Sequence, residues 1–199
     1  MNLASPGAHY AAQVSPARIA HYVLKTARYE ETVEWYKTVL MAHATFANDK
    51  LTFLRFDDEH HRIVVGYVPT AKPSSEDAEG VDHIAFTYAT LGDLVHTYER
   101  LAGVGIRPVR CINHGPTTSL YYQDPTGLGV ELMVDNFAKA EDCINWFFTE
   151  NFAKNPVGLA FDPEVLAEKF HAGVPDEVLL AQGSLPALRD ARQEHYQKQ

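Results

Sequence analysis

The sequence predicts an α+β domain built from two copies of one strand–helix–strand–strand–strand module, with a helical extension at its C-terminus. Short runs alternate between apolar and polar residues as strands do, and amphipathic stretches with helical spacing stand between them. The order of these runs repeats, because one constant shift places His21 on His83. The same shift places Tyr36 on Tyr98. Two like modules, packed into one curved mixed sheet, explain the repeat economically.

The first module is expected over residues 17–70. Its first strand is the alternating run 18–24, and an apolar stripe at i, i+3 and i+4 spacing predicts a helix over 29–40. Two further strands are expected over 51–56 and 61–68, separated by an acidic turn.

The second module, residues 80–136, repeats this order and completes a domain that spans 17–136. An amphipathic helix is followed by Gly103, which is typical of a helix end. The expected elements are a strand over 81–86, the helix over 91–102, and strands over 108–112, 119–122 and 129–134.

The two ends of the chain have a different character. Residues 1–16 are small and polar without a period, so we expect a flexible N-terminus. Residues 137–199 form the predicted helical C-terminal extension, in which Asp162, Pro163 and Gly173 bracket one helix. A second helix is expected over 176–182. The extension is too short for a second domain and is expected to pack on the sheet or on a partner subunit.

The composition excludes some classes of partner. The 199 residues carry a net charge of −9 and a pI of about 5.5, whereas nucleic acids and anionic membranes attract basic surfaces. No apolar stretch approaches the ~18 residues that span a bilayer, and the N-terminus lacks the pattern of a signal peptide. Cys111 and Cys143 are too few for a disulfide framework, so we expect a cytoplasmic protein.

Three residues suggest a metal site. His21 and His83 occupy equivalent points of the two modules, and Glu131 lies in an apolar strand. Burying an unpaired carboxylate costs several kcal/mol, which a metal would offset. Two imidazoles and one carboxylate leave coordination positions open, as in non-haem Fe(II) enzymes that bind substrate and O₂. Spacing alone also allows satisfied structural histidines and a glutamate that faces water.

Two stretches carry a resemblance to a known family. Residues 81–86 (VDHIAF) and 121–131 (YYQDPTGLGVE) resemble the signatures of the type I extradiol ring-cleavage dioxygenases, in the vicinal oxygen chelate, or glyoxalase/bleomycin resistance, superfamily. The resemblance covers roughly 18–136 and is closest to one-domain relatives of dihydroxybiphenyl dioxygenase. It implies that His21, His83 and Glu131 bind Fe(II), with Mn(II) as an alternative.

The resemblance also implies three catalytic residues. His61 is the second histidine of a His-His pair, which in the family is the acid–base residue. Tyr121 matches the active-site tyrosine, and His114 lies where a further histidine is expected to contact substrate or O₂. His114 is nearer to Tyr121 in sequence than in two-domain relatives, which weakens its match. Each residue has a structural alternative: His61 as a turn residue, Tyr121 as a core tyrosine.

The implied reaction cleaves a catechol-type ring beside its diol with O₂ and gives a muconic semialdehyde-type product. Biphenyl-type diols, simple catechols, a dihydroxyphenyl amino acid and a natural-product intermediate stay open as substrates. The alternatives are a glyoxalase- or epimerase-type isomerase of the same fold and a non-catalytic, resistance-type binding protein. An aromatic-rich segment, with Trp146, Phe147, Phe148 and Phe152, leads us to expect a homodimer or larger assembly.

Overall fold

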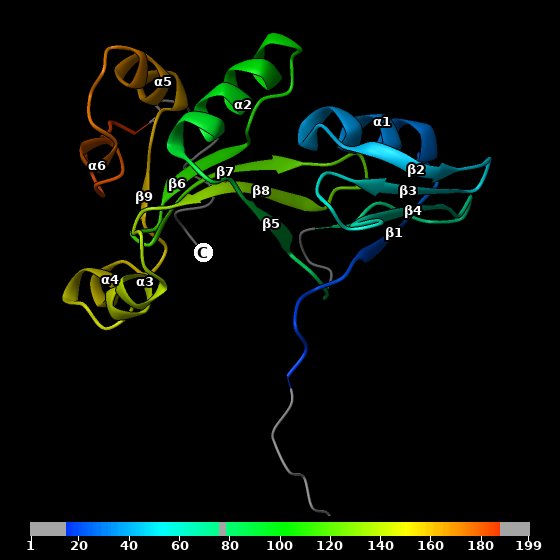
Figure 1. Cartoon of the computed structure of the whole chain (residues 1–199), viewed down its shortest axis with the longest axis horizontal. Helices are drawn as coiled ribbons and strands as arrows, with labels where there is room; N and C mark the ends of the chain where they lie inside the picture. The colour runs from blue at the N-terminus through cyan, green and yellow to red at the C-terminus, as the bar shows by residue number, and fades with distance from the viewer. Residues whose placement is uncertain (1–14, 76–78, 188–199) are drawn as a thin grey trace, which may run out of the picture.

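The structure is a computed structural model that describes residues 15–75 and 79–187. It contains two mixed sheets, each covered on one side by a helix (Figure 1). Apart from residues 15 and 16, the N-terminus predicted to be flexible lies outside the described residues. Within the described ranges, no helix is long and apolar enough to cross a membrane.

The first module forms a four-stranded sheet in the order β1-β4-β3-β2. Strands β1 and β4 are parallel, and the other neighbours are antiparallel. Helix α1 has the predicted bounds, because its apolar stripe buries Tyr36, Val39 and Leu40 against the sheet. The elements are β1 (Tyr22–Thr26), α1 (Tyr29–Leu40), β2 (His43–Ala47), β3 (Leu51–Arg55) and β4 (Ile63–Tyr67).

The second module repeats this topology in a five-stranded sheet, in the order β5-β8-β7-β6-β9. Its first and last module strands, β5 and β8, are again parallel neighbours. The side chain of Thr90 caps α2 by accepting the backbone N–H of Asp93 at 3.1 Å. The elements are β5 (His83–Thr87), α2 (Leu91–Gly103), β6 (Arg110–Asn113), β7 (Thr117–Gln123) and β8 (Gly129–Asp135).

The α+β class and the paired modules predicted from the repeat are confirmed. The strands form two hydrogen-bonded sheets, whereas we expected one continuous curved sheet. The sheets meet at their edge strands β1 and β5, where the rings of Tyr22 and Phe86 lie 6.4 Å apart. Helices α1 and α2 cover the same side of the molecule (Figure 1). A shared core therefore lies between these helices and the two sheets.

Several elements differ from the sequence expectations, most of them by one or two residues at a strand end. Strand β1 begins at Tyr22, so His21 precedes the strand in which we placed it. Strand β2 was not located from the sequence, because all five of its residues are exposed and no buried alternate positions mark it. Helix α6 ends at Leu179, three residues before the predicted end.

The C-terminal extension packs on the second module. Strand β9 (Leu159–Ala160), which is too short to have a sequence pattern, pairs with β6. Helix α5 begins after Asp162, as predicted, and Asp162 accepts the backbone N–H of Glu164 at 2.9 Å. It lies beside α2 (Figure 1). The remaining elements are α3 (Ala140–Trp146), α4 (Glu150–Lys154), α5 (Pro163–His171) and α6 (Asp176–Leu179).

Candidate active site

Strand register in the second module lines up three chemically active side chains. Arg110 on β6 pairs with Tyr121 on β7, and Tyr121 pairs with Glu131 on β8. Residues that are direct neighbours across strands point to the same face of a sheet. The adjacent Tyr122 points to the opposite face, where it is 1% exposed in the core, as we expected.

His83 adds an imidazole to this row from the edge strand β5. Its Nε2 lies 3.0 Å from the Glu131 carboxylate, which is almost fully buried. Two ligand atoms at about 2.1 Å from one octahedral metal, at right angles to each other, are about 3.0 Å apart. The spacing of His83 and Glu131 therefore fits two adjacent ligands of one divalent ion.

The hydrogen bond at the other ring nitrogen of His83, Nδ1, determines which tautomer the ring adopts and therefore whether Nε2 can bind a metal. Nδ1 lies 2.5 Å from the Asp82 carboxylate, which accepts a hydrogen bond, so Nδ1 carries a proton. A neutral His83 would then direct the Nε2 lone pair at a Glu131 oxygen, which is repulsive. A divalent ion bound by both atoms would replace this repulsion with two metal–ligand contacts. Metal-binding histidines commonly donate their second N–H to a carboxylate in this way.

Tyr121 and His114 form a hydrogen-bonded pair beside these donors. The Tyr121 hydroxyl lies 2.8 Å from His114 Nε2, and the Tyr121 ring stands edge-on to His83 with centroids 5.3 Å apart. Burial raises the pKa of Tyr121, and the Glu131 charge raises it further. Burial lowers the pKa of His114. At neutral pH the pair therefore consists of a protonated phenol and a neutral imidazole.

His21 and His61 form a second group, on the first module. Their ring centroids are 4.5 Å apart, and His61 stacks on Phe53 at 4.8 Å. Burial lowers the pKa of His61, as do the neighbouring His60 and His21, so the His61 ring is neutral at neutral pH. His60 of the predicted His-His pair points outward, and its side chain is 72% exposed.

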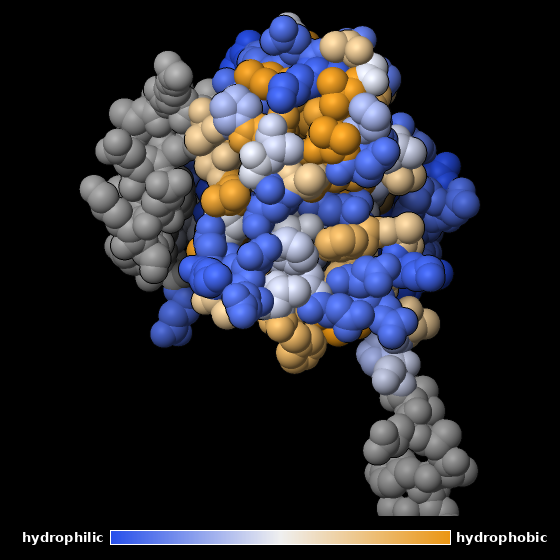
Figure 2. Space-filling view, turned by 90° about the vertical axis from the view of Figure 1, so that its left-hand side faces the viewer, coloured by the Kyte–Doolittle hydropathy of each residue, from blue (hydrophilic) through white to orange (hydrophobic). Residues whose placement is uncertain are grey.

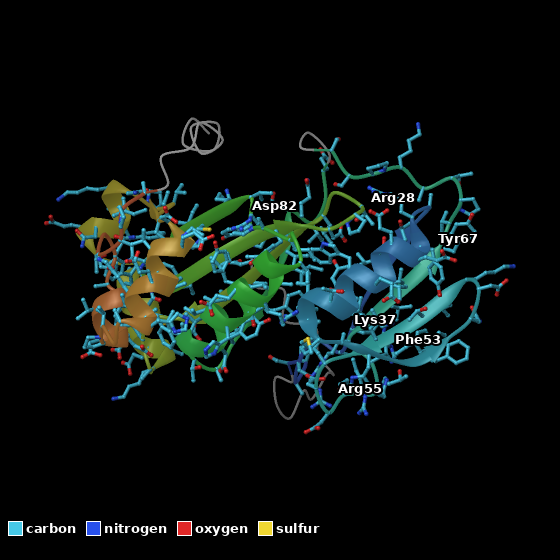
Figure 3. The ribbon with its side chains drawn as sticks, turned by 90° about the horizontal axis from the view of Figure 1, so that it is seen from above. Arg28, Lys37, Phe53, Arg55, Tyr67 and Asp82 are labelled. Carbon is cyan, nitrogen blue, oxygen red and sulfur yellow. The ribbon has the colours of Figure 1, made fainter. Side chains whose placement is uncertain are left out.

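The structure thus gathers the predicted residues into two groups. His83, Glu131, Tyr121 and His114 lie together, while His21 and His61 lie on the other side of the module junction. Figure 3 shows Asp82, next to His83, well apart from Phe53, which stacks on His61. Within the part of the chain that is described, no three His, Cys, Asp or Glu side chains are close enough to share a metal ion. The donors fit a metal in kind, and two of the three fit it in spacing.

Comparison with known proteins identifies the family. Residues 18–132 match the family model of the Glyoxalase/Bleomycin resistance protein/Dioxygenase superfamily. The chain belongs to this superfamily. One solved superfamily structure, a glyoxylase/bleomycin resistance protein/dioxygenase domain from Frankia sp., is 20% identical. It matches with a TM-score of 0.53 over 64% of this chain and 98% of that one, and thus shares the fold.

Two curated relatives within the superfamily are dioxygenases of Rhodococcus globerulus. Biphenyl-2,3-diol 1,2-dioxygenase 2 is 45% identical over 79% of this chain and 84% of its own length. Biphenyl-2,3-diol 1,2-dioxygenase 3 is 41% identical over 81% of this chain and 86% of its own length. Residues 1–136 together make up about 68% of the chain, so a match over 79% must reach into the C-terminal extension.

Four residues in contact with the candidate site were not predicted from the sequence. Asp82 supports His83, and Gly129 faces His83 so closely that a Cβ there would lie 2.8 Å from the His83 Cβ. Arg62 donates to the carbonyls of residues 19 and 20, at 2.8 and 3.1 Å, and so holds the backbone just before His21. The carbonyl of Val157 accepts from His114 Nδ1. Only Asp82 could have been predicted, because a carboxylate next to a candidate ligand histidine suggests a hydrogen bond to it. The other three act through backbone atoms, which have no signature in the sequence.

Proposed function

We infer that the chain is an extradiol ring-cleavage dioxygenase, an oxidoreductase that opens a catechol-type ring beside its diol. Both atoms of O₂ enter the product, and the carbon–carbon bond next to the diol breaks to give a muconic semialdehyde-type compound. The observation that carries this conclusion is 45% identity to a biphenyl-2,3-diol 1,2-dioxygenase across 79% of the chain. Biphenyl-2,3-diol is accordingly the substrate we propose to test first.

We propose that Fe(II) is the metal, with Mn(II) as the alternative, and that His21, His83 and Glu131 hold it. The spacing of His83 and Glu131 supports two of these ligands. The position of His21 next to the edge strand β1, which meets β5 through Tyr22 and Phe86, supports the third. Bound in this way, a divalent metal would supply Lewis acidity to the diol and a place for O₂ next to it.

Three side chains would serve as the base and the hydrogen-bond donors and acceptors of the reaction. His61, neutral at neutral pH, accepts a proton from a diol hydroxyl as the substrate binds. Tyr121 keeps its single proton, and its hydroxyl turns that proton from His114 Nε2 to the substrate oxygen as charge develops there. His114 Nε2 accepts from the Tyr121 hydroxyl and thereby orients it.

The rival activities of the fold are disfavoured on specific grounds. Glyoxalase-type isomerases commonly take carboxylate or glutamine ligands from both modules, but β4 of the first module reads Ile63–Tyr67 and contains no carboxylate. A binding protein without catalysis would not need a buried Glu131 in contact with His83.

The test is turnover with a panel of diols. The protein is purified without oxygen, loaded with Fe(II) or Mn(II), and mixed in air with biphenyl-2,3-diol, catechol and a dihydroxyphenyl amino acid. We expect a yellow product, O₂ uptake equal to the diol consumed, and loss of both in His83→Ala. Stoichiometric metal without product would redirect the proposal to isomerase substrates, and His21→Ala with unchanged metal content would remove His21 from the ligand set.

We also propose a cytoplasmic homo-oligomer. Both cysteines are free thiols, as a reducing compartment requires. Phe148 is 85% exposed beside the half-exposed Ile144 and Phe147, on the extension whose face Figure 2 shows as a mixture of hydrophobic and hydrophilic patches. Light scattering on the purified chain tests this directly, and Phe148→Ser should shift an oligomer toward the monomer.

A further inference from the structure

We propose that the C-terminal extension is a working part of the active site, because the backbone carbonyl of Val157 fixes the tautomer of His114. This inference rests on the proposed function of His114 and Tyr121, and it names the segment that positions them. The structure joins three groups in one hydrogen-bonded chain. Val157 oxygen lies 2.5 Å from His114 Nδ1, and His114 Nε2 lies 2.8 Å from the Tyr121 hydroxyl.

The direction of this chain follows from its first member. A carbonyl oxygen only accepts, so His114 Nδ1 must carry the proton. In a neutral imidazole the other nitrogen is then an acceptor, and Nε2 receives the Tyr121 O–H. Without the carbonyl, His114 could hold its proton on Nε2, which would point a donor at the Tyr121 oxygen. Tyr121 would then rotate its hydroxyl elsewhere.

Val157 supplies this carbonyl from a backbone that is held in place. Asn155 brackets the turn, since its amide donates to the Gly158 carbonyl at 2.7 Å and accepts the Gly158 N–H at 3.0 Å. Gly158 has a φ of +102°, and a Cβ there would lie 2.4 Å from the Asn113 carbonyl oxygen. The turn therefore approaches the end of β6, which His114 directly follows, more closely than any residue but glycine allows.

Further contacts tie the same strand to the extension from both sides. Asn113 pairs with Leu159 in the β6–β9 ladder. Its side chain donates to the Leu180 carbonyl at 2.8 Å, and its own carbonyl accepts from the Gln182 amide at 3.1 Å. Residues from two parts of the extension thus fix the residue that directly precedes His114.

Packing of the Val157 side chain does not explain the contact. That side chain is 51% exposed, so Val157 contributes its carbonyl and not a buried surface. The curated dioxygenase relatives also match well beyond residue 132, where the superfamily model ends. Those relatives therefore share part of the extension, as expected of a segment that the reaction needs.

The test moves the Val157 carbonyl with two variants. Asn155→Ala removes the hydrogen bonds that bracket Gly158. Gly158→Ala forces the turn away from Asn113 and also crowds the His114 backbone, because the added Cβ would lie 2.7 Å from the His114 Cα. Gly173→Ala is the matched control, because Gly173 also has a positive φ, of +79°, in the same extension, and nothing lies within 4 Å of its added Cβ. We measure kcat and KM for the diol, and the tautomer of His114 from ring ¹H–¹⁵N correlations assigned with His114→Asn.

We expect the Nδ1–H tautomer of His114 in the unchanged protein and in Gly173→Ala, and a mixture of tautomers in Gly158→Ala. A displacement near 1 Å at a catalytic group costs about 100-fold in rate, so kcat should fall about 10- to 100-fold with KM nearly constant. The same loss of kcat and mixture of tautomers are expected in Asn155→Ala, and in a His114→Asn background Asn155→Ala should cost nothing more.

Two results would overturn the inference: an unchanged tautomer in both Gly158→Ala and Asn155→Ala, or an equal loss of kcat with and without His114. If the unchanged protein cleaves no diol although the tautomer responds as expected, the positioning role stands. The proposed function would then be wrong.

Discussion

Substitution of Gly129 by alanine tests whether close approach of two backbones sets the position of His83. The added Cβ would lie 2.8 Å from the Cβ of His83 and from the carbonyl oxygen of Asp82, while ordinary contact begins at 3.4 Å. Strands β5 and β8 would have to separate by the difference, about 0.6 Å. The two contacts are a backbone oxygen and a Cβ at the start of β5, so no flexible side-chain end can absorb the change.

The cost can be worked out in two parts. Overpacking costs about 1–3 kcal/mol, and replacing glycine stiffens the unfolded chain and returns about 0.4–1 kcal/mol. The net loss of unfolding free energy should therefore be about 1–2 kcal/mol, which leaves the protein folded. A shift of this size at a metal ligand should weaken metal binding at least about tenfold and reduce kcat by a similar factor.

The assay pairs urea unfolding with metal titration of the same samples. Gly66→Ala is the control, because Gly66 also lies on a strand with a parallel neighbour, and a Cβ there would be 3.6 Å from the nearest atom, an ordinary contact. If Gly129→Ala binds metal and turns over diol as well as Gly66→Ala does, close approach of β8 does not position His83, and the argument fails.

Three further predictions concern single side chains. Asp82→Asn should weaken metal binding about 10- to 100-fold by titration, because the His83 Nδ1–H loses its carboxylate; unchanged affinity would dismiss Asp82 as a support. Tyr121→Phe should lower kcat about 100-fold. Tyr122→Phe should leave kcat unchanged and raise the unfolding free energy by up to about 1 kcal/mol, because the Tyr122 hydroxyl is buried without a hydrogen-bond partner. Equal losses of kcat in the two variants would contradict the catalytic role of Tyr121. Hydrogen bonds from Tyr98 and from Arg107 lower the pKa of Glu164. The ionised Glu164 therefore stabilises the fold above pH 4.5, the ordinary carboxyl pKa, and this stabilisation is lost as the pH falls through the lowered value. The Tm of Glu164→Gln should thus lie below that of the unchanged protein at pH 7, and the two Tm values should converge in acid. A difference in Tm that stays constant with pH would refute the linkage.

The sequence predicted those elements in which buried and exposed residues alternate with a regular spacing. Helix α1 matched its predicted bounds, because one face packs on the sheet and the other faces water. The separation of Tyr121 from Tyr122 followed from strand alternation for the same reason. Strand β2 was missed because an exposed strand has no buried alternate residues. Strand β9, with two residues, is held only by its ladder to β6.

The candidate site was predictable to the extent that it depends on side chains within one sheet. His83 and Glu131 meet because the register of β5 and β8 brings them together, and alternation indicated the face that they share. The Val157 carbonyl could not be foreseen, since every residue has a carbonyl and only the folded chain selects one. The position of His21 depends on how two separate sheets meet, which no local pattern encodes.

Because the proposed ligands come from both modules, a bound metal would also stabilise the contact between the modules of the proposed enzyme. His83 and Glu131 lie on neighbouring strands of one sheet, so their spacing persists whatever the other module does. The backbone before His21 is held within its own module by Arg62. The junction between the modules contains the shared core, ring contacts such as that of Tyr22 with Phe86, and hydrogen bonds such as that from the Tyr36 hydroxyl to Asp124 at 2.9 Å. A metal held by all three ligands would therefore join the two sheets, and its binding free energy would stabilise the junction.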